Sequence, residues 1–426
     1  MLELRFVVEN PEVVRKDLKK RGMLEKLSWV DELIELDKKR RDVQKKLDDL
    51  RHKKNELSLL INKNKKEGKD ISNLIKESSE LPKRIRELEG EFKNANQRIR
   101  YLLMRIPNIL DESVPIGKDD SENVEIKRVG TPKKFDFELK PHGVLAEELD
   151  IADFKRAAKV VGSGFVYLKN ELALLDLALQ RFAIEFLIKR GFTFVEPPFM
   201  LGREAYEGVT SLDDFEQVMY KIEGEDRYMI ATAEHPLVSM FMNETIDEDK
   251  LPLRFVGFSP CFRREIGSHG VDTKGLFRMH QFNKVEQVVF STPEQSQKIF
   301  EELQKNTEDM FAALGIPYRV VNICTGDMGI VASKKHDIEA WFPREKAYKE
   351  VASCSNCKTY QAVRLNIKVR RKDGTREYLH TLNNTGIATS RAMRAILENY
   401  QNRDGTVDIP EVLQPYMMGI SKIKKH

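Results

Sequence analysis

The sequence predicts an α+β protein, in which an antiparallel pair of long helices precedes a domain built on an antiparallel β-sheet flanked by helices. Three observations predict this fold: a sustained apolar repeat over about residues 27–106, a polar turn within that repeat, and strand-like segments after it. We therefore expect the 426 residues to form an amino-terminal helical arm, residues 1–110, and a second domain, residues 111–426.

The first short element is a helix that begins at Asn10-Pro11-Glu12. Asn10 can cap a helix, proline suits the first helical position, and Glu12 complements the positive end of the helix dipole. The sequence predicts that this helix ends at about Lys20.

The arm is predicted from apolar residues that recur in steps of three, four or seven. The first run comprises Val30, Leu33, Leu36, Val43, Leu47, Leu50, Leu57 and Leu60. The second, after a polar turn at 62–70, comprises Ile71, Leu74, Leu81, Ile85, Leu88, Phe92, Ala95, Ile99, Leu102 and Ile106. Such a repeat indicates a coiled coil, and one short turn makes its two helices antiparallel. We expect Pro82 to kink the second helix without breaking it.

Positive charge is concentrated on this arm. Residues 38–70 contain thirteen Lys or Arg residues and six Asp or Glu residues, a local net charge of +7, whereas the whole chain carries +4. The excess is compatible with a solvated helix face and with a surface that binds phosphates. Charge alone leaves both interpretations open.

The second domain is predicted from the segments that follow Pro107. Residues 115–137 are expected to form a linker and loops, and helices are expected at 172–190 and 387–401. Strands are expected at 192–195, 228–231, 253–258, 283–290, 318–322 and 362–370. Strands outnumber close β-α-β alternations, which favours an antiparallel sheet.

Composition excludes several classes of protein. Hydrophobic residues make up 41% and charged residues 33%, the balance of a soluble folded protein. Residues 1–22 lack the apolar run of a signal peptide and no run of about 18 apolar residues occurs, so we expect a cytoplasmic protein without a membrane segment. Cys354 and Cys357 form one Cys-x-x-Cys without a second ligand pair, so we expect no zinc.

The most informative segment is Phe262-Arg263-Arg264-Glu265. An arginine two residues from a glutamate can simply form an intramolecular ion pair. Here, however, a polar, glycine-bearing loop follows at 267–275, and an apolar strand is expected to return at 276–282. This arrangement places the arginine at the edge of a loop between two strands.

Three motifs carry a resemblance to a known family. The Phe-Arg-x-Glu segment, its loop and Phe282 resemble motif 2 of class II aminoacyl-tRNA synthetases, and 191–198, with Pro198, resembles motif 1. Residues 386–391 resemble motif 3, a glycine-bearing strand that enters a helix with an arginine. With Thr232-Ala233-Glu234 before motif 2, the segments 145–151 and 383–386, and the helical arm, essentially the whole chain is similar to seryl-tRNA synthetases.

The resemblance implies an ATP site. Arg263 would bind the α-phosphate, Glu265 the adenine amino group and Met279 the base through its backbone, while Phe282 and Arg391 would cover the two faces of adenine. Arg391 would also reach the γ-phosphate, so Arg263 and Arg391 are the expected catalytic pair. The implied ATP-binding set is Arg263, Arg264, Glu265, Met279, Phe282, Glu350, Val351, Ala352, Ser353 and Arg391. By themselves, Phe282 could be a core aromatic residue and Arg391 a helix-surface cation.

The resemblance also implies a magnesium site and a serine site. Glu350 and Ser353 would hold Mg²⁺ between the ATP phosphates, although the family more often has serine where Ala352 stands. The implied serine-binding set is Thr232, Ala233, Glu234, Arg263, Glu286 and Thr385, in which Glu286 and Thr385 would contact the substrate's amino and hydroxyl groups. Without the resemblance, Glu286 could be a paired strand glutamate.

The implied function is serine–tRNA ligation in a homodimer formed through motif 1, with tRNA(Ser) gripped by the arm. The sequence leaves open whether tRNA(Sec) is also charged. Two alternatives remain: a catalytically silent paralogue that binds RNA, and an amino acid:carrier-protein ligase. The arginines expected at the ATP site argue against the silent paralogue, which would not need them. The helical arm argues against the carrier-protein ligase, which lacks one.

Overall fold

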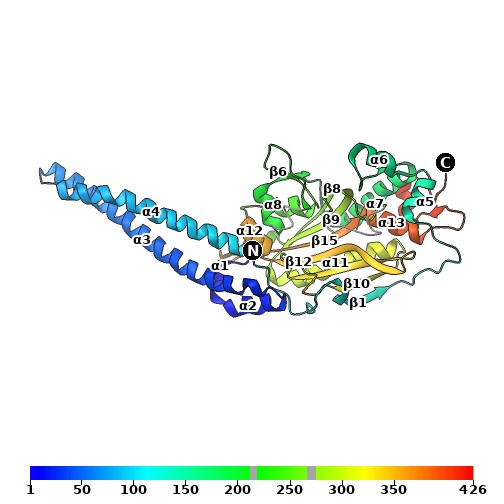
Figure 1. The fold of residues 1–426 in the computed structure, drawn as a ribbon, viewed down its shortest axis with the longest axis horizontal. Coiled ribbons are helices and arrows are strands. Elements are labelled where there is room, and N and C mark those ends of the chain that lie inside the picture. The colour runs from blue at the N-terminus through cyan, green and yellow to red at the C-terminus, as the bar shows by residue number, and fades with distance from the viewer. Residues whose placement is uncertain (212–217, 266–274, 426) are drawn as a thin grey trace. The chain divides into compact units, whose positions relative to one another are not determined.

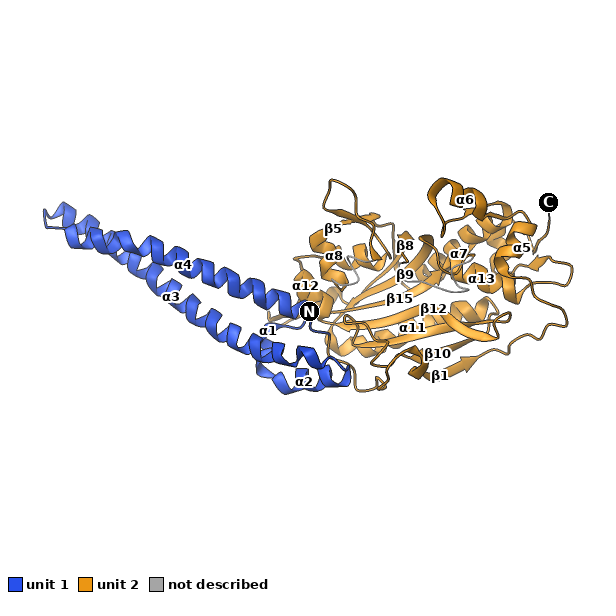
Figure 2. Ribbon diagram, viewed as in Figure 1, with its two compact units in different colours: residues 1–107 blue, residues 108–426 orange. Residues whose placement is uncertain are grey.

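The computed structural model describes residues 1–211, 218–265 and 275–425. Contacts divide the chain into two compact units, Met1–Pro107 and Asn108–His426 (Figure 2). Unit 1 is helical, and unit 2 contains a large sheet with helices packed on it. The α+β fold class predicted from the sequence is confirmed.

Unit 1 consists of two long helices that run side by side and three short ones (Figure 1). Their bounds are α1 Leu4–Glu9, α2 Pro11–Lys20, the 3₁₀ helix η1 Leu24–Lys26, α3 Leu27–Lys66 and α4 Ser72–Leu103. The predicted turn at 62–70 is shorter than expected, because α3 continues to Lys66. Asn10 precedes α2 as predicted but does not cap it; its side-chain amide instead donates to the Phe6 carbonyl at 3.2 Å.

The coiled-coil seam follows the predicted repeat with one exception. Buried residues of its distal part are Val43, Leu47, Leu57, Leu81 and Ile85. The prediction for Leu60 was wrong: it is 42% exposed, and the partly buried residue is its neighbour Ile61. Steps of four and three alternate along this seam through Val43, Leu47, Leu50 and Leu57, so a step of four follows Leu57 and Ile61 takes the position. Helix α4 runs through Pro82 without a break.

The centre of unit 2 is an eight-stranded sheet of order β1-β10-β11-β12-β15-β9-β8-β4, antiparallel except for the β4–β8 pair. Its strands are β1 Val124–Val129, β4 Thr193–Val195, β8 Leu253–Phe262, β9 Gln281–Ser291, β10 Tyr318–Asn322, β11 Lys334–Phe342, β12 Ala347–Lys358 and β15 His380–Ala388. The long central strands β12, β15 and β9 lie next to one another, which brings distant parts of the sequence together.

Helices and small strands complete unit 2. Its helices are α5 His142–Glu148, α6 Phe154–Val161, α7 Asn170–Ile188, α8 Arg203–Val209, α10 Glu234–Ser239, α11 Ser296–Ala313, α12 Tyr360–Leu365 and α13 Thr389–Asn399. Its 3₁₀ helices are η2 Asp120–Glu122, η3 Glu248–Lys250, η5 Pro293–Gln295 and η6 Glu411–Met417. Its small sheets pair β2 Ala152–Asp153 with β3 Tyr167–Leu168, β5 Met200–Gly202 with β6 Arg227–Met229, β16 Val407–Asp408 with β17 Lys422–Ile423, and β13 Lys368–Arg370 with β7 Thr245–Asp247 and β14 Arg376–Tyr378.

Four predicted elements differ from the structure. Residues 362–370 are not one strand, because residues up to Leu365 belong to α12, whose buried side chains pack against α8. The loops expected at 115–137 contain the edge strand β1. The returning strand begins at Gln281 rather than at residue 276. The last predicted helix begins at Thr389, since Ile387 is still part of β15.

The alternation of side chains along β9 separates a core face from an open face. Val285 and Val289 join the core formed with α7 and α11, and Gln287 donates to the hydroxyl of Thr307 on α11 at 3.0 Å. Lys284 and Glu286 point to the opposite face, because successive strand residues alternate. Within the described ranges, no helix is long and apolar enough to cross a membrane.

Candidate active site

A cavity of about 340 Å³ opens on the face of the sheet that Lys284 and Glu286 occupy. Strands β9, β12 and β15 and the start of α13 form much of its wall. Eleven residues singled out in the sequence line it: Thr232, Glu234, Arg263, Phe282, Glu286, Glu350, Val351, Ala352, Ser353, Thr385 and Arg391. The fold thus gathers segments separated by more than one hundred residues around one space.

Two β-bulges aim side chains into this cavity. On β12, Glu350 pairs with Glu339 and Ala352 with Ile338, so Val351 is an extra residue between them. Residues 350 and 353 would face opposite sides of a regular strand, but the extra residue turns Glu350 and Ser353 to the same side. Both line the cavity.

The second bulge lies on β15 and centres on Gly386. Thr385 pairs with Glu286 and Ile387 with Val285, which leaves Gly386 as the extra residue. A Cβ atom at Gly386 would lie 3.2 Å from the Val285 carbonyl oxygen, so a glycine suits this close approach. As a result, Thr385 and Ala388 both line the cavity, and α13 begins directly after it.

Glu234 lies at the first position of α10. Its backbone N–H donates to the hydroxyl of Thr232 at 3.1 Å, and its carboxylate accepts from the side-chain amide of Gln361 at 2.9 Å. The hydroxyl of Thr381 donates to the other end of that amide at 2.6 Å and so fixes its orientation. Burial in the cavity wall, together with the charge of Glu286, raises the pKa of Glu234 to about 7.

Glu286 is a buried carboxylate with two partners. The ammonium of Lys284 lies 2.5 Å from its carboxylate, and the hydroxyl of Thr385 donates to the same oxygen at 3.4 Å. Burial raises the pKa of Glu286, although Lys284 and Arg263 both act to lower it. The two glutamates and Lys284 therefore form a polar, acid-rich end of the cavity.

Two arginines line the cavity as well. The guanidinium of Arg263 hydrogen-bonds to the Ala231 carbonyl at 3.4 Å and lies 5.2 Å from the centre of the Phe282 ring. Arg391 donates from Nη1 to the carboxylate of Glu350 at 3.0 Å. Removal of the carboxylate of Glu350 from water acts to raise its pKa, but the positive charges of Arg391 and Lys335 outweigh this effect and hold the pKa at about 2. Glu350 is therefore ionised at neutral pH.

Four predicted site residues do not line this cavity. The side chain of Ala233 is buried at the start of α10, and Arg264 is exposed. Glu265 has a φ of 45° and lies 3.9 Å from Arg278, and β8 ends at Phe262, so Arg263 and Glu265 follow the strand. The predicted loop at 267–275 lies outside the described residues except for Gly275.

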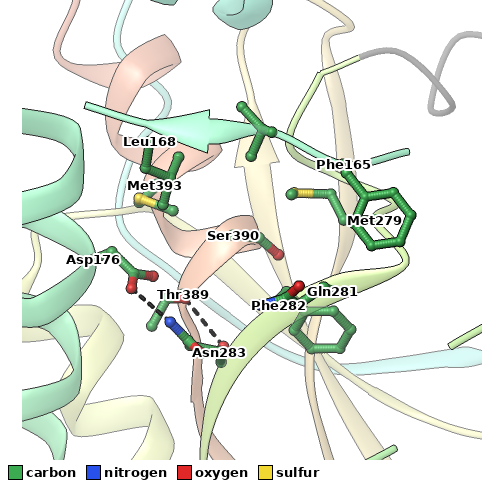
Figure 3. A pocket seen from close by; sticks show the side chains of 11 residues that line it. Phe165, Leu168, Asp176, Met279, Gln281, Phe282, Asn283, Thr389, Ser390 and Met393 are labelled. Atoms are coloured by element: carbon green, nitrogen blue, oxygen red, sulfur yellow. Dashed lines mark hydrogen bonds between the residues drawn. The ribbon is translucent and has the colours of Figure 1, made fainter. Parts of the chain in front are cut away.

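Met279, the fourth, lines a smaller adjacent cavity of about 110 Å³, which shares Phe282 with the larger one (Figure 3). Figure 3 shows Asp176 of α7, Asn283 and Thr389 pointing toward one another. The Asn283 amide donates to Asp176 at 2.7 Å, and the Thr389 hydroxyl donates to the Asn283 carbonyl at 3.0 Å. These bonds tie β9 and the start of α13 to α7.

Sequence reasoning missed several residues of the cavity, among them Lys284, His235 and Ser355. Lys284 could have been recognised, because it precedes Glu286 by two residues in an apolar strand and such neighbours share a face. His235 is buried and its pKa falls to about 3 through burial, so it is neutral at physiological pH. It carries no sequence signal that separates it from a core histidine.

Cys354 and Cys357 are buried on β12, and burial raises the pKa of both thiols. Among the described residues, no three His, Cys, Asp or Glu side chains gather to hold a metal ion. The pair Glu350 and Ser353 is not such a cluster, since a hydroxyl supplies one of its two oxygens.

Comparisons with known proteins show the class to which the chain belongs. Residues 218–400 match the model of the tRNA synthetase class II core domain (G, H, P, S and T), and residues 1–110 match the seryl-tRNA synthetase N-terminal domain. These matches assign the chain to the class II aminoacyl-tRNA synthetases.

Individual relatives narrow the class to a family. The serine–tRNA ligase of Methanocella arvoryzae is 61% identical over 422 residues, 99% of each chain. The crystal structure of seryl-tRNA synthetase from Pyrococcus horikoshii complexed with ATP has 50% identity, a TM-score of 0.93 and complete coverage of both chains. A cytoplasmic serine–tRNA ligase from Naegleria fowleri in complex with AMP has 34% identity and a TM-score of 0.87, and the match covers 100% of this chain and 99% of that one. This chain belongs to the seryl-tRNA synthetase family.

Proposed function

We propose that this chain is an ATP-dependent serine–tRNA ligase, which activates L-serine to seryl-adenylate with release of pyrophosphate and transfers serine to the 3′-terminal adenosine of tRNA(Ser). One observation carries the proposal: an acid-rich end, Glu234 and Glu286, and two arginines, Arg263 and Arg391, line the same cavity. An amino acid and a nucleoside triphosphate need these opposite charges side by side.

ATP binds, in this proposal, between the arginines. Arg263 contacts the α-phosphate, where negative charge grows as the serine carboxylate attacks and pyrophosphate leaves, so a fixed guanidinium stabilises the transition state. Adenine stacks on Phe282, and Arg391 covers its other face and reaches the γ-phosphate. Arg264, Glu265 and Met279 contact the nucleotide from the segment that follows β8 and precedes β9. Val351 and Ala352 of β12 form part of the cavity wall beneath it.

Glu350 and Ser353 would hold Mg²⁺. The donor set fits the ion, because the bulge turns an ionised carboxylate and a hydroxyl to one side of β12, and hard oxygen ligands suit Mg²⁺. Glu350 and Ser353 would hold the ion, whose charge would orient the phosphates and offset that of the leaving group. Arg391, the present partner of Glu350, lies close enough to act on the same phosphates.

Serine binds at the acid-rich end of the cavity. Glu234 and Glu286 surround the ammonium group, while Thr385 and Thr232 hydrogen-bond within the same pocket, and Ala233 holds the start of α10 behind it. A site built to bind a hydroxyl leaves buried polar groups unpaired when alanine enters. Neither half-reaction needs a protein nucleophile; positioning and charge stabilisation supply the catalysis.

The arm is the proposed tRNA-binding element. With the exception of Arg40, the thirteen cations between Lys38 and Asp70 are exposed. Contact with tRNA phosphates along this surface releases counterions, and recognition by shape suits a folded RNA. We further propose a cytoplasmic homodimer formed through motif 1, in which the arm of one subunit serves the partner's active site; tRNA(Sec) is a second candidate acceptor.

The two alternatives have less support. A silent paralogue would not need an ionised Glu350 beside Arg391, and all the nucleotide-facing groups are retained. A carrier-protein ligase would lack the arm, whereas residues 1–110 match the family's amino-terminal domain.

The decisive experiment is amino-acid-dependent ATP–pyrophosphate exchange with each of the twenty amino acids. We expect exchange with serine, and alanine to be rejected by a factor on the order of 10⁴. Exchange with a different amino acid, or with none, would overturn the proposal. Serylation of tRNA against a carrier protein as acceptor then separates the ligase from its alternative.

A further inference from the structure

A buried polar cluster lies behind Arg391, outside the cavity lining. It consists of His142 at the start of α5, Arg394 and Glu398 on α13, and the chain at Leu276 and Phe277. Exposed fractions are 0% for Glu398, 2% for Arg394 and 6% for His142. Polar groups this deeply buried are costly unless they are paired, so the pattern of their bonds is informative.

Hydrogen bonds determine which imidazole nitrogen of His142 carries the proton. The backbone N–H of Leu276 donates to Nε2 at 2.9 Å, and since an amide nitrogen only donates, Nε2 must be unprotonated. The proton of the neutral ring is then on Nδ1, which lies 3.3 Å from the Glu398 carboxylate and donates to it. Glu398 also accepts from Nε of Arg394 at 3.0 Å. His142 thus links α13 to the backbone of Leu276.

Phe277 connects this cluster to Arg391. The guanidinium of Arg394 lies 4.6 Å from the centre of its ring, and that of Arg391 lies 5.2 Å from it. Arg391, Arg394 and Glu398 are spaced by three and four residues, so they follow one face of α13. Helix α13 therefore carries both Arg391, which lines the cavity, and Arg394, which packs against the same Phe277 ring as Arg391.

Gly275 supports the same interpretation independently. Its φ is +90°, and a Cβ atom at this position would lie 2.2 Å from Nε2 of His142. The ring thus approaches the backbone at a distance that a side chain at residue 275 would prevent. This close approach and the positive φ both suit glycine next to His142.

We propose that His142 is a positioning residue for the ATP site. By accepting from Leu276 and donating to Glu398, it holds Phe277 against Arg391 and so orients the guanidinium toward the nucleotide. The inference rests on the proposed function in placing the ATP phosphates at Arg391. If His142 has this role, loss of the Nε2 acceptor lowers the affinity for ATP, whereas the affinity for serine, which binds near Glu234 and Glu286, is unaffected.

The test compares His142→Asn with His142→Gln. Asparagine can still donate to Glu398 but is too short to accept from Leu276, whereas the oxygen of glutamine reaches about where Nε2 lies. We expect His142→Asn to raise the KM for ATP about tenfold with the KM for serine changed less than twofold, and His142→Gln to restore most of the ATP affinity. A matched control is His380→Asn, because His380 is another buried histidine of unit 2 and lies outside the cluster.

The outcomes separate the inference from the proposed function. Calorimetric titration of each variant with ATP–Mg²⁺ alone needs no serine and no turnover, so it tests His142 even if the wild-type chain exchanged pyrophosphate with another amino acid. Equal losses in the asparagine and glutamine variants, a parallel rise in the KM for serine, or the same change in His380→Asn would overturn the inference. Melting temperatures measured alongside distinguish a general loss of stability.

Discussion

Glu234→Gln is expected to stabilise the protein and impair serine binding at once. The pKa of Glu234 rises from 4.5 to about 7, and a shift of one unit corresponds to about 1.4 kcal/mol, so ionising this group in the folded state costs at most about 3.5 kcal/mol. Gln361 can still donate to the oxygen of a glutamine at residue 234, because Thr381 fixes its orientation. The substitution therefore removes charge without removing that hydrogen bond.

The sign of the pH dependence follows from this raised pKa. Between about pH 4.5 and 7 the folded state keeps a proton that the unfolded state releases, so wild-type stability falls as the pH rises through this window. Above pH 7 the full cost is present. We therefore expect the melting temperature of Glu234→Gln to exceed that of the wild type by several degrees at pH 8 and by much less at pH 5.

Serine activation should show the opposite dependence. Because kcat/KM reports the free enzyme, its value for serine in the wild type should fall about tenfold per pH unit below pH 7, with a midpoint that belongs to the coupled pair Glu234 and Glu286. In Glu234→Gln it should be about 10- to 100-fold lower at pH 8, the size of one lost charge-assisted hydrogen bond, and nearly independent of pH.

The assay is serine-dependent pyrophosphate exchange between pH 6 and 8, with thermal unfolding at the same pH values. Glu308→Gln is the control, since Glu308 is a buried carboxylate that pairs with Lys127 away from the cavity. It should keep the wild-type slope. A wild-type kcat/KM that is constant between pH 6 and 8, or a glutamine variant that keeps the slope, would refute the reasoning.

Two further predictions concern the arm and the metal. Deletion of residues 30–105 should abolish serylation of tRNA in an aminoacylation assay yet spare pyrophosphate exchange, because unit 2 contains the whole cavity; loss of both would contradict a separable arm. Glu350→Gln should raise the Mg²⁺ concentration for half-maximal exchange about tenfold or more, since it removes the charged ligand. Glu339→Gln, at the opposite residue on β11, should leave it unchanged; equal effects of the two would count against the assignment.

Elements with strong periodicity could be predicted from the sequence. The coiled coil follows from apolar spacing that persists over both of its helices. Short apolar runs could not be assigned in this way. The run at 362–365 is helical because it packs against α8. The seam position predicted for Leu60 is occupied by Ile61, because the sequence pattern allows a step of either three or four residues after Leu57. Local spacing does not specify which partner a short segment finds.

The site shows the same division. The resemblance carried by three ordered motifs identified Arg263, Phe282 and Arg391 as candidates, and the resemblance to seryl-tRNA synthetases added Glu286. Their common cavity depends on strand neighbours that are distant in sequence, such as Glu286 beside Thr385.

The sequence by itself thus determined the arm, the α+β class and the chemical inventory of the site. Only the tertiary structure decided that Glu350 and Ser353 face one side, through the bulge at Val351, that Lys284 joins Glu286, and that His142 reaches Leu276. Strand alternation predicts side-chain direction only in a regular ladder, and an extra residue reverses it. Contacts across a sheet depend on register between distant segments, which no local pattern records.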